Sequence, residues 1–160
     1  MVVDILTAKG WTISFAESCT AGLAAARLVD VPSASNVFNA SFVTYSNAAK
    51  VKYLGVSEET IANKGVVSEE VAIQMAVGTA RANDARVGVG ITGIAGPTGG
   101  SEEKPVGMVC FGFYIDGKTM TSTRKFGNIG RDAVRAASVE YVYTFLASML
   151  PRLTGMKLEI

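Results

Sequence analysis

The sequence predicts an α/β fold, a single domain in which helices form a sandwich around a mixed, mainly central β-sheet. One observation is that runs rich in branched and aromatic residues alternate along the chain with Ala-rich or amphipathic runs. A second is composition, because 160 residues with 49% hydrophobic and 18% charged side chains suffice for one core. We find no internal repeat or linker and expect one domain over residues 1–160.

The first part of the chain predicts two helices, two strands and a third, capped helix. Apolar positions within residues 2–6 fit one face of a short helix, residues 12–16 form a strand, and residues 20–28 form an Ala-rich helix. The branched and aromatic residues of 37–45 predict the next strand. Ser46-Asn47 is the expected cap of a helix that runs to Leu54 and stops at a glycine.

The middle of the chain predicts two further helices. Ser57-Glu58-Glu59-Thr60 opens a short one, because Ser accepts hydrogen bonds from the first free N–H groups and Glu suits the first turn. Ser68-Glu69-Glu70 opens a longer one that runs to about Asn83. Its Val71, Met75 and Ala76 share one face, which we expect to point inward.

The last part predicts three strands and a closing helix. Residues 86–92 read as a buried strand, and residues 106–115 and 119–126 as a hairpin. Asp116-Gly117 supplies the turn, since this pair accepts the positive φ angles of tight hairpin turns. Residues 130–150 predict a long closing helix. Together with the other helices it would cover the mixed sheet.

Charge and composition limit the partners and the location. A formal net charge of +1 provides no broad electrostatic attraction for nucleic acid or an anionic membrane, so we expect neither as a direct partner. No run approaches the roughly 20 apolar residues of a membrane span. Cys19 and Cys110 each have a better local explanation than pairing, and we expect no secretory leader. We expect a cytoplasmic location.

The segment from Glu17 to Gly22 lies between a strand and a helix, where a nucleophile can be displayed. The chain contains no histidine, so any attack by Ser18 or Cys19 needs another proton acceptor, for which lysine is the leading candidate. Free N–H groups near Cys19 and Thr20 would stabilise an oxyanion, and Gly22 is a further candidate binding residue of this turn. The alternatives are an ordinary helix cap, a buried structural cysteine, or a reactive Cys19 thiol.

A second cluster lies between Tyr45 and Lys50, which we expect at the same edge of the sheet as Ser18. A desolvated Lys50 would have a lowered pKa and could remove the Ser18 proton, and Tyr45 could relay it. The alternative is a solvated helix lysine. Lys52 would point elsewhere on the helix, and the sequence does not decide between the two lysines.

A glycine-rich segment follows the strand at residues 86–92. Gly88-Val-Gly90-Ile-Thr-Gly93 matches a dinucleotide fingerprint in letters, but it lies within a strand instead of opening a helix, so we reject that interpretation. The following loop can bring backbone N–H groups close to a ligand, or it is only a mobile connection. Its candidate binding residues are Thr92, Gly93, Ala95, Gly96, Gly99 and Gly100.

Arg131 lies in the first turn of the closing helix, where a cation is unfavourable to the helix dipole. Its guanidinium could hold a phosphate or carboxylate, with Arg135 one turn further on sharing the task. The alternative is surface pairing with Asp132 or Glu140. Too few His and Cys residues are present for a usual zinc site, and we expect neither a metal nor a cofactor.

Several motifs together resemble those of the C-terminal domain family of CinA, the competence and damage-inducible protein. The resemblance covers nearly the whole chain. It rests on Ala16-Glu17-Ser18-Cys19-Thr20, Tyr45-Ser46-Asn47 with Lys50, Val67-Ser68-Glu69-Glu70, Gly90 to Pro97, and Lys104-Pro105-Val106-Gly107.

The resemblance implies a metal-independent amidohydrolase that converts nicotinamide mononucleotide to nicotinic acid mononucleotide and ammonia. It assigns Ser18 as nucleophile, Lys50 as general base, Tyr45 as proton relay, and Arg131 with the glycine-rich loop as part of the nucleotide pocket. Together with the apolar closing helix it also favours a homo-oligomer.

The chain departs from the family pattern of two glycines at Ala21-Gly22. A positive φ at Ala21 would distort the oxyanion site, whereas a helical Ala21 would be harmless. A second hypothesis is therefore a nucleotide-binding or regulatory module without turnover, related to competence or the DNA damage response.

Overall fold

The computed structural model describes residues 1–156, which form one mixed sheet with helices on both faces. The strands are β1 (Ile13–Glu17), β2 (Phe42–Val43), β3 (Val87–Gly93), β4 (Met108–Ile115) and β5 (Lys118–Lys125). The helices are α1 (Val2–Lys9), α2 (Leu23–Val29), α3 (Asn47–Leu54), α4 (Glu58–Lys64), α5 (Glu69–Ala82) and α6 (Arg131–Thr154), with a short 3₁₀ turn η1 (Ala34–Asn36).

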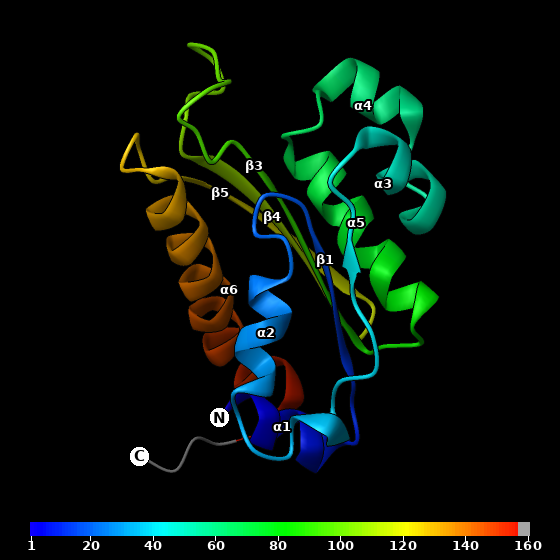
Figure 1. The fold of residues 1–160 in the computed structure, drawn as a ribbon. Helices are drawn as coiled ribbons and strands as arrows, with labels where there is room; N and C mark the ends of the chain where they lie inside the picture. Colours follow the sequence, from blue (N-terminus) through cyan, green and yellow to red (C-terminus); the bar gives the residue numbers. More distant parts are fainter. Residues whose placement is uncertain (157–160) are drawn as a thin grey trace.

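The strand order is β2-β1-β3-β4-β5. β1 pairs in parallel with both β2 and β3, whereas β4 runs antiparallel to β3 and β5. Helices α1, α2 and α6 lie on one face of the sheet, and α3, α4 and α5 lie on the other (Figure 1). The predicted α/β fold with helices around a central mixed sheet is confirmed.

The larger hydrophobic core lies between the sheet and the α1, α2 and α6 layer. Phe111 and Phe113 of β4 are fully buried, and Tyr141 and Phe145 of α6 pack against them, with Phe113 and Phe145 stacked at 3.8 Å between ring centroids. Each such aromatic buries a large apolar area. This packing fixes α6, which carries Arg131 and Arg135, against the sheet.

Helix α5 approaches the other face closely because glycines in the sheet leave room for its backbone. A Cβ at Gly88 would lie 2.1 Å from the Ala76 carbonyl oxygen, and one at Gly90 would lie 2.1 Å from that of Ala72. These glycines of β3 let α5 pack closely on the sheet, and the next element along the chain is the strand β4, not a helix. The geometry agrees with rejecting a dinucleotide fingerprint, which requires a helix start at this position.

Several predicted elements are confirmed with small shifts. α3 spans Asn47–Leu54, with the Ser46 hydroxyl accepting from the N–H of Ala49. The β4–β5 turn is at Asp116-Gly117, with φ angles of 47° and 86°. Among the described helices none has the length and apolar character that a membrane crossing requires.

Two predicted elements were wrong in extent. The strand expected over residues 37–45 is regular only at Phe42–Val43, with one further bridge at Phe38, because this edge of the sheet is half-exposed and has a partner on one side only. The helix expected from Thr20 begins at Leu23, since Ala21 and Gly22 have φ angles of 46° and 96° and cannot be helical.

Candidate active site

Ser18 follows the carboxyl end of β1, which lies between its two parallel neighbours β2 and β3. The chain leaves β1 toward β2 on one side, while β3 lies on the other, so Ser18 occupies a topological switch point where α/β sheets open a crevice. The Ser18 N–H donates to Ile91 O at 3.1 Å, and its carbonyl accepts from Ala21 N at 3.0 Å. These bonds hold the serine in a tight turn over residues 18–22.

Lys50 of α3 reaches Ser18. Its Nζ lies 3.2 Å from Ser18 Oγ and donates to Thr44 O at 2.7 Å. The side chain is only 1% exposed, and burial lowers the pKa of Lys50 from its ordinary value of 10.5. Lys52 instead is exposed beside the Tyr53 ring, so the structure selects Lys50 as the lysine that meets Ser18.

No carboxylate forms an ion pair with Lys50 within residues 1–156. The adjacent carboxylate of Glu17 is fully buried, but it accepts from the N–H groups of Ala24 and Ala25 at 2.8 and 3.1 Å. It therefore stabilises the start of α2. A desolvated amine with only neutral partners favours its uncharged form, which can accept a proton.

Cys19 is 5% exposed, and burial raises the pKa of its thiol to about 11. At neutral pH the sulfur therefore stays protonated and is a poor nucleophile.

Two buried hydroxyls near this turn, those of Thr20 and Thr44, have no hydrogen-bond partner within the described part of the chain. Unpaired buried groups are costly, and they deserve a functional explanation.

A pocket of about 290 Å³ opens beside Ser18 and Lys50. It gathers most of the residues predicted from sequence, together with several others. The full lining is Ser18, Tyr45, Asn47, Lys50, Val66, Val67, Thr92, Gly93, Ile94, Ala95, Gly96, Thr98 and Arg131.

Five predicted binding residues do not line this pocket: Cys19, Thr20, Gly22, Gly99 and Gly100. Gly22 is instead the N-cap of α2, while Gly99 and Gly100 lie on an exposed loop. Sequence reasoning missed Asn47, Val66 and Val67 as lining residues. Asn47 lies inside the Tyr45–Lys50 segment, and Val67 is the first residue of the motif Val67-Ser68-Glu69-Glu70. From sequence alone both segments are explained by helix capping, although their residues also reach the pocket.

Arg131 connects three elements around the pocket. Its guanidinium donates to Gly96 O and to the Tyr45 hydroxyl, each at 2.8 Å. Neither alternative partner pairs with it among the described residues, since Glu140 pairs with Arg27 at 2.6 Å and Asp132 forms no ion pair. In the part of the chain that the structure describes, the Arg131 charge therefore has only neutral partners.

Tyr45 is 60% exposed, and its hydroxyl accepts from Arg131. Within the described residues it makes no hydrogen bond to Ser18 or Lys50.

In residues 1–156 no three His, Cys, Asp or Glu side chains come together as a metal donor set.

The sequence comparison agrees with this architecture, since residues 1–150 match the CinA C-terminal domain family. The chain belongs to that family. A CinA-like protein of Kosmotoga olearia is 47% identical over 150 residues, covering 94% of this chain and 36% of the relative. The chain thus spans about a third of the length of such family members.

A relative of similar length carries a more specific name. The nicotinamide-nucleotide amidohydrolase PncC of Enterobacter agglomerans is 52% identical over 131 residues, covering 81% of this chain and 79% of that protein. Among solved structures, the competence/damage inducible protein CihA of Agrobacterium tumefaciens superposes with a TM-score of 0.89 at 40% identity, covering 92% of this chain and 90% of that one.

Proposed function

We propose that this member of the CinA C-terminal domain family is an amidohydrolase that converts nicotinamide mononucleotide to nicotinic acid mononucleotide and ammonia. The observation that carries the proposal is the 3.2 Å contact between Ser18 Oγ and the buried amine of Lys50 at the edge of a pocket. The name of the Enterobacter agglomerans relative supports the substrate class. The reaction belongs to pyridine nucleotide salvage.

The proposed mechanism uses Ser18 as nucleophile and Lys50 as general base. The neutral amine takes the Ser18 proton while Oγ attacks the carboxamide carbon, giving a tetrahedral oxyanion. The N–H groups of Cys19 and Thr20 make no hydrogen bond to another residue within the described chain and are available to that oxyanion. Protonated Lys50 returns its proton to the leaving nitrogen, and the carbon–nitrogen bond breaks to release ammonia.

The second half of the reaction releases the product. Lys50, neutral again, removes a proton from a water molecule that attacks the acyl carbon of the Ser18 ester. The bond between that carbon and Ser18 Oγ breaks, and the serine regains a proton. Every step needs only the serine, the lysine and water, so we propose a metal-independent reaction without a cofactor. Tyr45 is proposed to assist as a proton relay, for which its hydroxyl, which accepts from Arg131, must come within hydrogen-bond reach of Ser18 or Lys50.

The pocket lining suits a pyridine nucleotide. Val66, Val67 and Ile94 provide apolar surface for the ring, and Arg131, without a carboxylate partner in the described residues, provides a cation for the phosphate. Thr92 adds a hydroxyl that donates to Val66 O at 2.9 Å. Gly93, Ala95 and Gly96 let the backbone approach the ligand.

The test is an assay of purified protein with nicotinamide mononucleotide, with and without a chelator, measuring both ammonia and nicotinic acid mononucleotide. Ser18→Ala and Cys19→Ala are run beside the wild type. The proposal expects chelator-resistant turnover that Ser18→Ala abolishes and Cys19→Ala retains. Loss with Cys19→Ala alone, or with chelator, would contradict it.

A second candidate function is a nucleotide-binding or regulatory module without turnover, connected to competence or DNA damage. The observation that favours it is the φ of 46° at Ala21, because this left-handed conformation suits glycine and the nucleophile turn is strained. Detectable binding of the nucleotide without ammonia release would favour this function.

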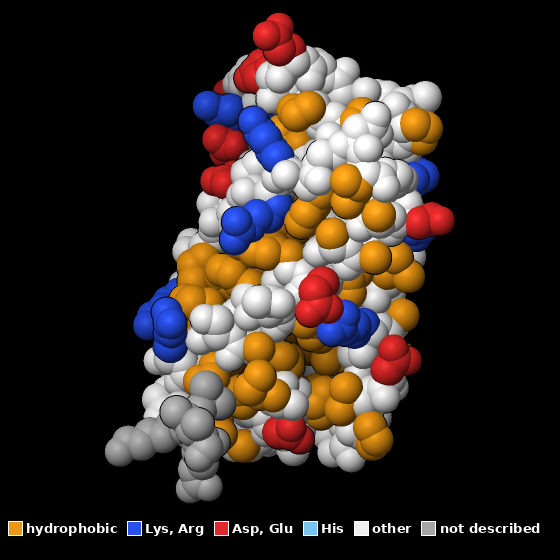
Figure 2. Space-filling model, turned by 90° about the vertical axis from the view of Figure 1, so that its left-hand side faces the viewer, with side chains coloured by type: hydrophobic (Ala, Val, Ile, Leu, Met, Phe, Trp, Pro, Cys, Tyr) orange, Lys and Arg blue, Asp and Glu red, His pale blue; other side chains and the backbone are white. Residues whose placement is uncertain are grey.

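We also propose that the chain forms a homo-oligomer in the cytoplasm. Hydrophobic side chains gather on the face that carries α6 (Figure 2). An open groove between α2 and α6 is lined by Leu23, Ala26, Ala136 and Val139, together with Arg27 and Asp30. Light scattering after gel filtration measures the oligomeric state, and a monomer at micromolar concentration would contradict the proposal.

A further inference from the structure

Arg135 lies on α6 one turn beyond Arg131, but it faces a different part of the site. Its Nε donates to Cys19 O at 2.9 Å, and its Nη2 approaches Thr20 O at 3.5 Å. Both carbonyls belong to the turn that directly follows Ser18. Arg135 does not line the pocket and is half-buried against this turn.

The geometry of the peptide group links Arg135 to the proposed oxyanion site. In a trans peptide the C=O and the following N–H point in opposite directions. Because Arg135 holds the Cys19 carbonyl toward α6, the N–H of Thr20 points away from α6. That N–H makes no hydrogen bond to another residue within the described chain. A cation on the carbonyl also polarises the peptide and strengthens the donor.

The turn needs such an external contact because its own sequence does not favour its conformation. Ala21 has a left-handed φ of 46°, which costs an L-residue roughly 1–2 kcal/mol. The N-cap residue of α2, Gly22, offers no side chain to hold the free N–H groups. Glu17 fixes the first turn of α2 through Ala24 and Ala25 but not the peptides of residues 19 and 20.

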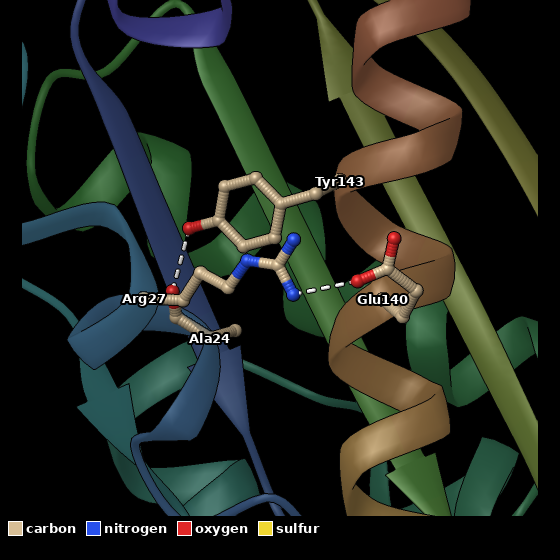
Figure 3. A network of polar contacts seen from close by, with 4 residues as sticks. All are labelled: Ala24, Arg27, Glu140 and Tyr143. Atoms are coloured by element: carbon tan, nitrogen blue, oxygen red, sulfur yellow. Dashed lines mark hydrogen bonds and ion pairs between the residues drawn. The ribbon is translucent and has the colours of Figure 1, made fainter. Parts of the chain in front are cut away.

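Other contacts between α2 and α6 lie further along the helices and do not touch the turn. Arg27 pairs with Glu140 at 2.6 Å and lies over the ring of Tyr143, whose hydroxyl donates to Ala24 O at 2.6 Å (Figure 3). These contacts join the two helices. Arg135 is therefore the arginine of α6 that acts on the nucleophile turn itself.

We propose that Arg135 is a positioning residue for the reaction. Its guanidinium holds the Cys19 and Thr20 carbonyls so that the Thr20 N–H faces the oxyanion formed when Ser18 attacks. This inference rests on the proposed amidohydrolase function. It predicts that Arg135 affects the transition state more than the binding of the substrate.

The test compares Arg135→Ala and Arg135→Lys with Arg27→Ala, a control that removes an arginine from the same helix interface without touching residues 18–22. We expect Arg135→Ala to lower kcat by roughly 10-fold to 100-fold with KM nearly unchanged. This loss is smaller than the roughly 10²–10³-fold loss of kcat that follows removal of a direct oxyanion donor. Added guanidinium should restore part of the activity. Arg135→Lys, which retains a positive charge, should lose less, and Arg27→Ala should change thermal stability but not kcat.

A second readout does not depend on the nucleotide. A fluorophosphonate probe forms a bond between phosphorus and Ser18 Oγ and releases fluoride, with Lys50 taking the serine proton, and the adduct places an oxygen in the oxyanion site. Arg135→Ala and Arg135→Lys should label more slowly than the wild type. Equal labelling rates in the wild type and the Arg135 variants would overturn the role of Arg135. The same conclusion would follow if guanidinium does not restore kcat and the loss of kcat follows the loss of thermal stability.

The two proposals fail in different ways. In one outcome the wild type is labelled at Ser18 and Arg135→Ala is labelled more slowly, but the wild type does not deamidate nicotinamide mononucleotide. This result contradicts only the proposed substrate. A wild type that neither labels nor turns over contradicts both.

Discussion

The hydroxyl of Ser18 lies 3.2 Å from the amine of Lys50, although 32 positions separate them in the sequence. The carboxyl end of β1 supplies the serine, and α3, whose start is fixed by the Ser46 cap, supplies the lysine. Within residues 1–156 the lysine has only two hydrogen-bond partners, Ser18 Oγ and Thr44 O, and both are neutral. The pair is thus an amine and a hydroxyl in a desolvated site, which is the arrangement that a serine nucleophile without histidine requires.

The pH dependence of kcat tests the role of Lys50. Burial lowers the Lys50 pKa below 10.5, and only the neutral amine accepts a proton, so kcat should rise with pH along one ionisation that lies below 10.5. Lys50→Met should remove this ionisation and reduce kcat by at least about 10³-fold, as loss of a catalytic base does. A profile that stays flat with pH in the wild type would exclude Lys50 as the base.

The same burial predicts that Lys50 reduces stability. The folded pKa lies below the unfolded value of 10.5, so between the two the unfolded chain binds more protons and the free energy of unfolding rises with pH. Lys50→Met should therefore raise the free energy of unfolding at neutral pH, by between about 0.5 and 2 kcal/mol. Urea denaturation at several pH values measures the difference, which should shrink as the pH approaches 10.5. Lys52→Met, at an exposed position, is the control, and an equal effect there would contradict the explanation.

Arg131 is expected to recognise the phosphate. Arg131→Ala should raise KM for nicotinamide mononucleotide by roughly 10-fold to 100-fold, since a hydrogen bond to a charged group contributes about 1.5–3 kcal/mol. The riboside that lacks the phosphate serves as control substrate, because its kcat/KM should change little in the variant. Steady-state kinetics with both substrates gives the comparison. Equal losses for both would assign Arg131 to holding Tyr45 and Gly96 in place.

Ala21→Gly should stabilise the protein. A left-handed φ costs an L-residue roughly 1–2 kcal/mol, and the extra freedom of glycine in the unfolded chain offsets about 0.4–1 of that. The expected gain is about 0.5–1 kcal/mol in the free energy of unfolding. Ala26→Gly, on the exposed side of α2, is the matched control and should lower it by about 1 kcal/mol. A loss of stability in both variants would show that the turn is not strained.

Local signals in the sequence predict the positions of Ser18 and Lys50 in the secondary structure. Ser18 and Lys50 each lie at the boundary between a strand or loop and a helix, and such boundaries are marked by caps and by changes in hydrophobic period. The hairpin turn at Asp116-Gly117 is equally local, because the two residues favour the positive φ angles it needs. These features could be derived without knowing the tertiary structure.

Features that depend on tertiary contacts could not be predicted. The exposed edge shortens β2 to Phe42–Val43 although residues 37–45 have strand composition. Val66 and Val67 reach the pocket because the segment between α4 and α5 folds over the end of β3, where Thr92 donates to Val66 O. The contact between Arg135 and the Cys19 carbonyl joins positions 116 apart, and no local pattern marks it.

In the proposed mechanism Ser18 attacks the amide and becomes acylated. The direct measurement is mass spectrometry of the protein after rapid acid quenching of its reaction with nicotinamide mononucleotide, followed by peptide mapping. We expect an adduct on Ser18 with the mass of the substrate less ammonia, and no such adduct in Ser18→Ala. An adduct on Cys19 would contradict the mechanism. So would equal turnover by the wild type and Ser18→Ala with no acylated peptide in either protein.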